Sequence, residues 1–155
     1  MIGAGPQAKL SLKGRALRLL SMREHSRLEL ERKLASHEQE PGEMARVLDE
    51  LQAKGFINEA RVVESVLYRR AARLGAGRIR QELQAKGLEG ELVAQAMEQL
   101  RGTELARARE VWRRKFDQPP RDAAERAKQS RFLAARGFGG EVVRKVLAGG
   151  FEDED

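Results

Sequence analysis

The six residues Glu50-Leu-Gln-Ala-Lys-Gly55 recur unchanged as Glu82-Leu-Gln-Ala-Lys-Gly87, and a large apolar residue, Phe56 or Leu88, follows each copy. A glycine after a basic residue and before an apolar one is typical of a helix C-terminus. Glycine takes the left-handed conformation there, and the apolar side chain folds back onto the last turn. Arg136-Gly-Phe138 has the same form. The three segments therefore predict three helix ends.

The 32 residues that separate the two copies are not the length of a repeat. A shift of 49 residues places Leu30 on Ile79, and a shift of 50 places Lys86-Gly-Leu88 on Arg136-Gly-Phe138. A shift of 44 pairs Tyr68-Arg-Arg70 with Trp112-Arg-Arg114. The sequence therefore predicts a repeating unit of about 50 residues that holds three helices.

Helical periodicity and capping residues support this prediction. Met44, Val47, Leu48 and Leu51 follow the i, i+3, i+4, i+7 spacing of an amphipathic helix. Side chains that accept from a free backbone N–H are favoured at helix N-termini, and a glutamate three residues later completes a capping box. The predicted N-terminal caps are Ser26 with Glu29, Asp122 with Glu125, Asn58 and Thr103.

These patterns predict an all-α protein of three tandem three-helix, helix-turn-helix-like repeats. Because a unit of this size buries little apolar surface alone, we expect the repeats to stack into an elongated curved body. The predicted parts are a disordered N-terminal segment at 1–14, helical repeats at 15–57, 58–102 and 103–150, and an acidic tail at 151–155.

Composition argues against several classes of protein. The chain has no cysteine, no apolar stretch of the roughly 20 residues that a membrane span needs, and no pattern of a secretory signal, so we expect a cytoplasmic protein. Neither His25 nor His37 has a catalytic or metal-binding partner at suitable spacing, and we interpret both as solvated. Gly3-Ala-Gly5 lacks the Gly-Lys-Ser/Thr ending of a phosphate-binding loop, and Gly75-Ala-Gly77 has Arg80 in place of the third glycine of a dinucleotide-binding motif. We predict no enzyme, cofactor or metal site.

The positive charge is concentrated after the first repeat. Residues 1–57 carry 10 positive and 8 negative side chains, residues 58–150 carry 20 and 12, and the last five residues carry four acids. Such a surplus favours a polyanion or an acidic protein as partner, although a solvated helix surface is the simpler interpretation. The candidate contact residues are Arg69, Arg70, Arg73, Arg78, Arg80, Lys86, Arg113, Arg114 and Lys115. We interpret Tyr68 and Trp112, beside two of the arginine pairs, as core anchors.

Several segments in order resemble the RecX family. They are Ser11-Leu-Lys-Gly-Arg-Ala-Leu-Arg-Leu-Leu20, Arg23-Glu-His-Ser26, Lys54-Gly-Phe-Ile-Asn58, Arg78-Ile-Arg-Gln-Glu-Leu83 and Arg131-Phe-Leu-Ala-Ala-Arg-Gly-Phe138. Each is a weak motif, but the order and spacing match over roughly 11–148. The sequence departs from the family pattern at Val62, at Glu40-Pro-Gly42 and at Gly75-Ala-Gly77, which we expect to affect packing and curvature.

The resemblance implies a non-catalytic regulator of the RecA recombinase, and we expect the chain to be a monomer. Such a protein would bind the groove of the RecA–DNA filament and inhibit its extension, ATP hydrolysis, strand exchange and coprotease activity. It would thereby modulate DNA repair, recombination and the SOS response. Such a protein would bind single- or double-stranded DNA weakly, or would contact DNA within the filament. The alternative is a DNA-binding protein that uses its helix-turn-helix-like units without RecA.

Overall fold

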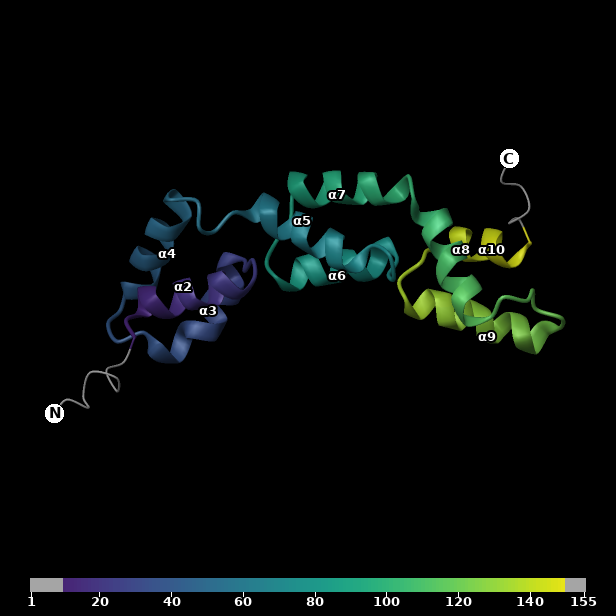
Figure 1. Ribbon diagram of the computed structural model, residues 1–155, viewed down its shortest axis with the longest axis horizontal. Coiled ribbons are helices and arrows are strands. Elements are labelled where there is room, and N and C mark those ends of the chain that lie inside the picture. Colours follow the sequence, from purple (N-terminus) through teal and green to yellow (C-terminus); the bar gives the residue numbers. More distant parts are fainter. Residues whose placement is uncertain (1–9, 150–155) are drawn as a thin grey trace. The chain divides into compact units, whose positions relative to one another are not determined.

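The computed structural model describes residues 10–149, which form nine α-helices, one short 3-10 turn and no β-strand (Figure 1). The all-α prediction is confirmed. The helices are α2 (Leu12–Met22), α3 (Arg27–Leu34), α4 (Glu43–Ala53), α5 (Glu59–Arg70), α6 (Ala76–Ala85), α7 (Glu91–Arg101), α8 (Glu104–Lys115), α9 (Ala123–Ala135) and α10 (Gly140–Leu147), and the turn is η1 (Ala35–His37). None of these helices is long and apolar enough to span a bilayer.

The helices follow one another as three triplets. We call α2–α4 the first domain, α5–α7 the second domain and α8–α10 the third domain. The chain also divides into two compact units between Val62 and Val63, inside α5. The second and third domains, from Val63 onward, therefore lie in one unit.

The first domain packs around a small apolar core. Its buried residues are Leu12, Ala16, Leu30, Leu34, Leu48, Leu51 and Ile57. The helix α2 begins at Leu12, and the Ser11 side chain caps it by accepting from the Gly14 N–H at 2.9 Å. Residues 12–14 are thus helical, which corrects the expected disorder of the whole 1–14 segment. Residues 1–9 and the acidic tail at 151–155 lie outside the described residues.

Most of the predicted helix ends are present. Gly55, Gly87 and Gly137 all have the positive φ of a left-handed C-terminal residue, at 86°, 81° and 96°. Ser26 and Glu29 form a complete capping box, and the Asn58 side chain accepts from the Arg61 N–H at 3.0 Å.

Two cap predictions need correction. The Thr103 side chain caps nothing, because its hydroxyl donates to the Leu100 carbonyl at 3.4 Å instead. Asp122 does accept from the Glu125 N–H at 2.9 Å, but the Glu125 carboxylate accepts from the N–H of Arg121 at 2.8 Å. The reciprocal half of that capping box therefore lies one residue earlier than predicted.

The first helices of the second and third domains match at a shift of 45 residues, and not at the predicted 44. Both ends of α5 (Glu59–Arg70) and α8 (Glu104–Lys115) differ by that number. Tyr68 is 90% exposed whereas Trp112 is 3% exposed, so Trp112 is a core anchor and Tyr68 is not. The error has a simple cause: one residue of slip rotates a helical side chain by about 100°. Arg114 and Lys115 are the equivalents of Arg69 and Arg70.

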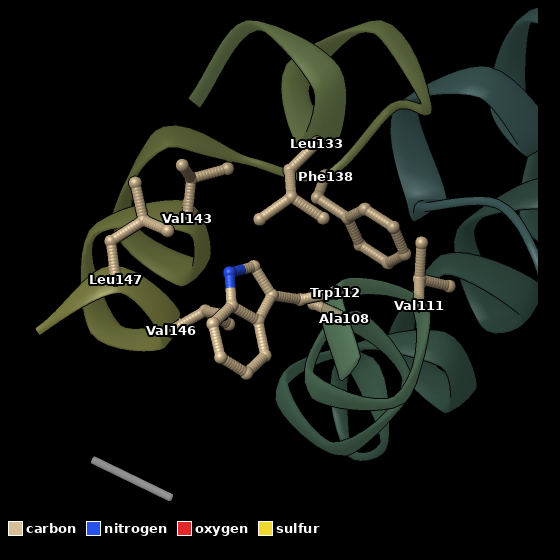
Figure 2. Close-up of a cluster of buried hydrophobic side chains, with 8 residues drawn as sticks. All are labelled: Ala108, Val111, Trp112, Leu133, Phe138, Val143, Val146 and Leu147. Carbon is tan, nitrogen blue, oxygen red and sulfur yellow. The ribbon is translucent and has the colours of Figure 1, made fainter. Parts of the chain in front are cut away.

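The core of the third domain is centred on Trp112. The cluster contains Ala108, Val111, Trp112, Leu133, Phe138, Val143, Val146 and Leu147, and Figure 2 shows the indole directed toward the α10 side of the cluster. The indole N–H donates to the Gln129 side chain at 2.8 Å, and Gln129 is 5% exposed. This buried hydrogen bond satisfies the polar atom of the largest core side chain.

The second and third domains meet through backbone hydrogen bonds. The Gly75 and Gly77 N–H groups, at the start of α6, donate to the carbonyls of Arg136 and Gly137 at 2.7 and 3.1 Å, and these carbonyls lie just after α9. The free donors of one helix N-terminus thus meet the free acceptors of one helix C-terminus, an arrangement that also opposes unlike ends of two helix dipoles. This joint fixes the surface on which the predicted cations lie.

Candidate functional site

The nine candidate cations occupy α5, α6, α8 and the residues that follow α5 and α6. The structure brings most of them into two groups. Arg69, Arg70 and Lys86 converge on one carboxylate, whereas Arg73, Arg114 and Lys115 line one depression. Arg113 lies beside the second group, and Arg78 and Arg80 belong to neither.

The first group surrounds Glu82 on α6. Arg70 Nε lies 3.1 Å from Glu82 Oε1, while Lys86 Nζ and Arg69 Nη2 lie 3.8 and 4.0 Å from Glu82 Oε2. The Glu82 side chain is 23% exposed, so solvent screens these pairs only in part. One carboxylate therefore offsets part of the charge of three predicted contact residues.

The second group lines a depression of about 270 Å³ between the end of α5, α8 and α9. Its floor includes Ala72, Val111 and Phe132, and its charged residues are Arg73, Glu110, Arg114, Lys115 and Arg136. The carboxylate of Glu110 already pairs with Arg113 at 3.2 Å and with Arg114 at 3.5 Å. The depression therefore keeps a strong excess of positive charge.

The Phe132 ring contacts two of these cations. Arg136 Cζ lies 4.7 Å and Lys115 Nζ lies 5.5 Å from the centroid of the Phe132 ring, within the range of a cation–π contact. Phe116 contacts Phe132 edge to face, with 5.3 Å between ring centroids. Arg136 and Phe132 were not among the candidate residues. The helix-end motif Arg136-Gly-Phe138 marked a cation here, but no local pattern indicated that Phe132 would hold it.

Arg78 and Arg80 have different surroundings. The Arg78 guanidinium donates to the Ala135 carbonyl at 2.7 Å, so this residue supports the joint between the second and third domains. Arg80 is exposed and makes no ion pair with any residue of 10–149. Arg78 is also exposed, but its Nη1 is held by the Ala135 carbonyl, whereas the Arg80 guanidinium makes no such contact with a residue of 10–149.

Arg107 is a further cation that the sequence did not single out. Its Nη1 donates to the carbonyls of Ala71 and Leu74 at 2.9 and 2.6 Å, and its Nη2 donates to the carbonyl of Leu100 at 3.1 Å. Burial lowers the pKa of Arg107, which the nearby Glu104 partly opposes. The guanidinium thus joins the ends of α5 and α7 to α8, so its role is structural.

The two histidines differ, which corrects one prediction. His37 is exposed, but His25 is 1% exposed, because it lies between the end of α2 and the capped start of α3. His25 Nδ1–H donates to the Arg23 carbonyl at 3.0 Å, and Nε2 accepts from the Lys33 ammonium at 3.1 Å. Both ring nitrogens are occupied by these contacts. No group of three His, Asp or Glu side chains within 10–149 is arranged to hold a metal ion.

Sequence models of all three domains of the RecX family match this chain. The first three-helix domain matches at 13–51, the second at 58–97 and the third at 103–147. The matches fall on the three helix triplets in the same order.

Curated relatives extend this likeness over nearly the whole chain. The Regulatory protein RecX of Leptothrix cholodnii is 58% identical over 144 residues, which cover 93% of this chain and 92% of that protein. The Regulatory protein RecX of Ralstonia nicotianae is 47% identical over 144 residues, with coverage of 93% and 91%.

Solved structures show the same fold at low identity. The crystal structure of RecX from Lactobacillus salivarius has a TM-score of 0.75 at 18% identity, and covers 89% of this chain and 93% of that one. A second crystal structure, of regulatory protein RecX, has a TM-score of 0.72 at 22% identity, with coverage of 87% and 70%.

Proposed function

The chain belongs to the RecX family of regulatory proteins, and from this premise we propose that it is a non-catalytic regulator of the RecA recombinase. It binds the groove of the RecA–DNA filament and inhibits filament extension, ATP hydrolysis, strand exchange and coprotease activity. In the cell it acts in the cytoplasm, where it modulates DNA repair, recombination and the SOS response.

The observation that carries this proposal is the cationic surface shared by the second and third domains. Arg73, Arg114, Lys115 and Arg136 line one depression, and among the described residues the one acid in its lining, Glu110, pairs with Arg113 and Arg114. A surface of this charge attracts nucleic acid and acidic protein alike, and both are present in a nucleoprotein filament.

A rigid joint makes this surface suitable for bridging. The hydrogen bonds from Gly75 and Gly77 to the end of α9, together with those of Arg78 and Arg107, hold the second and third domains as one body. A rigid body that contacts two successive RecA subunits resists the rearrangement that subunit addition or exchange requires. Inhibition then follows from binding alone, without any catalytic group.

The test is the ATPase activity of RecA on single-stranded DNA with substoichiometric amounts of this protein. We expect the rate to fall as filaments shorten, at ratios well below one protein per RecA subunit. The charge-reversal variants Arg114→Glu and Lys115→Glu should inhibit less than the native chain while keeping their helix content by circular dichroism. An unchanged ATPase rate at every ratio would contradict the proposal.

Binding to DNA in the absence of RecA, measured beside the ATPase activity, distinguishes a filament regulator from a DNA-binding protein that acts without RecA. A stand-alone DNA-binding protein that neutralises about six phosphates of duplex DNA has a log–log salt slope near −5. Such a slope, combined with no effect on RecA, would favour the helix-turn-helix-like alternative. A shallower slope with inhibition of RecA supports a filament regulator.

A further inference from the structure

The second and third domains carry the same arrangement of cations around two different central residues. Buried Ile79 and Leu83 of α6 are matched by Gln129 and Leu133 of α9, a shift of 50 residues. The same shift places Glu82 on Phe132. It also places Lys86 on Arg136, and these two residues are the C-caps of their helices.

The helices that precede α6 and α9 each contribute one more equivalent cation. Arg70 ends α5 and Lys115 ends α8, at the shift of 45 that relates these two helices. In the second domain Arg70 and Lys86 lie 3.1 and 3.8 Å from the Glu82 carboxylate. In the third domain Lys115 and Arg136 lie 5.5 and 4.7 Å from the centroid of the Phe132 ring.

This difference changes the charge that each domain offers to an anion. A carboxylate that pairs with a cation cancels one unit of charge, and an approaching anion must compete with it. An aromatic ring attracts a cation through its quadrupole but cancels no charge. Arg73 adds a further cation to the third-domain group. Among the described residues that line the depression, the one acid is Glu110, which pairs with Arg113 and Arg114. Competition from a carboxylate therefore falls on Arg114, whereas Lys115 and Arg136 contact the Phe132 ring.

We propose that the depression around Phe132 is a phosphate-binding site for a nucleic-acid backbone, held by Arg73, Arg114, Lys115 and Arg136. Glu82 makes the equivalent place in the second domain a weak site, because it acts as a built-in competitor for Arg69, Arg70 and Lys86. The inference rests on the proposed function only in taking nucleic acid to be part of the partner.

Charge density favours nucleic acid over an acidic peptide. Four cations share a depression of about 270 Å³, and a nucleic-acid strand matches such density with one negative charge per roughly 3.4 Å. Phe132 already contacts Arg136 and Lys115 with its ring and packs edge to face against Phe116, so a base that stacked on it would have to compete with these contacts. Contact should therefore be with the backbone and independent of base sequence.

The test compares matched variants of the full chain. Binding of a fluorescein-labelled oligo-dT is followed by anisotropy over a range of KCl concentrations, for Lys115→Gln beside its equivalent Arg70→Gln, and for Arg136→Gln beside Lys86→Gln. Loss of one phosphate contact to a single strand lowers the log–log slope by about 0.7, which is about fivefold in affinity at 0.1 M salt. We expect this loss for each third-domain variant and less than about twofold for its partner.

The competitor role of Glu82 predicts a gain. Glu82→Gln should tighten binding of oligo-dT severalfold and steepen the salt slope, because the carboxylate that competes for three cations is removed. Glu98→Gln, which removes an exposed acid that pairs with Arg101 on α7, is the control of equal charge change. An equal gain in both variants would mean that net charge alone decides, and would overturn the inference.

Other results contradict the proposal in distinguishable ways. Equal losses in the two domains, or no binding of oligo-dT by the native chain at low salt, would overturn it. So would poly-glutamate binding that depends on Lys115 and Arg136 while oligo-dT binding does not, since the site would then take acidic protein. The conservative variants Lys115→Arg and Arg136→Lys should keep oligo-dT affinity, which separates charge from packing. RecA inhibition that survives all of these losses would leave the proposed function intact and remove only this site.

Discussion

The Gly75 N–H donates to the Arg136 carbonyl at 2.7 Å, across 61 residues of chain. The contact is close because each segment has a glycine at the crossing, Gly75 on one side and Gly137 on the other. A Cβ atom on Gly75 would lie 2.4 Å from the carbonyl carbon and oxygen of Gly137 and from the Phe138 nitrogen. Two backbones can therefore meet here only if residue 75 is glycine.

Gly75→Ala should separate the second and third domains locally. The added methyl group meets backbone atoms that cannot rotate away, so we expect a loss of about 1–3 kcal/mol in the free energy of unfolding, typical of overpacking. Hydrogen exchange should also accelerate at the backbone amides of residues 75 and 77. Gly140→Ala is the control, since a Cβ atom there meets nothing within 4 Å. Equal free energies of unfolding for the two variants would show that the backbones at this contact adjust to the added methyl group without loss of stability.

The Arg107 guanidinium should contribute more to stability than an exposed arginine of the neighbouring helix. Arg107→Gln removes donors from the carbonyls of Ala71, Leu74 and Leu100. Each carbonyl that loses a charged donor costs about 1 kcal/mol or more when water replaces it poorly. We expect a thermal midpoint several degrees lower, on the order of 4–8 °C per kcal/mol for a small domain. Arg101→Gln, at a side chain that is 70% exposed, should change it little.

Local signals predicted the helices of this protein well. Gly55, Gly87 and Gly137 end helices as expected, and Ser26 caps one, because such ends depend on residues within a few positions of each other. The apolar stripe from Met44 to Leu51 also faces the core, with Leu48 and Leu51 fully buried. A helix pattern repeated three times thus predicted the three triplets.

The remaining features depend on partners far apart in the chain, which a single sequence does not pair. Tyr68 and Trp112 have similar neighbours in sequence, yet the 45-residue register exposes one and buries the other. His25 has a polar sequence context but is buried between α2 and α3. Nor did any local pattern show that Glu82 would bind three of the predicted cations.

The Trp112–Gln129 hydrogen bond should appear as a coupling free energy. Gln129→Leu deprives the indole N–H of its acceptor at 2.8 Å, at a cost of about 1–3 kcal/mol. In a Trp112→Phe background the same substitution should cost less, because no indole N–H remains. Leu67 and Ile79 occupy the equivalent positions in the second domain, so an apolar pair fits this packing. Urea unfolding of the native chain, the two single variants and the double variant gives the coupling free energy, which we expect to exceed about 0.5 kcal/mol. Additive losses in the free energy of unfolding would contradict a stabilising hydrogen bond between the two side chains.

The buried His25 should make stability depend on pH near neutrality. Burial lowers its pKa from 6.5, and the charges of Arg23 and Lys33 add to this, while the hydrogen bond to the Arg23 carbonyl and the charge of Glu29 oppose it. Between the folded and unfolded pKa values the unfolded chain binds a proton that the folded chain does not. The contribution of His25 to the free energy of unfolding is therefore fully present above pH 6.5 and is lost as the pH falls through the folded pKa.

Two measurements check this pH dependence. Proton NMR of the imidazole resonances should place the pKa of His25 below 6.5. Urea unfolding between pH 5 and about 7.5 should show the native stability falling toward acid, with a smaller slope in His25→Gln and the native slope in the control His37→Gln. A His25 pKa at or above 6.5 would contradict the neutral ring that accepts from Lys33. In that case Nε2 would carry a proton, and the 3.1 Å contact would set two cations against each other.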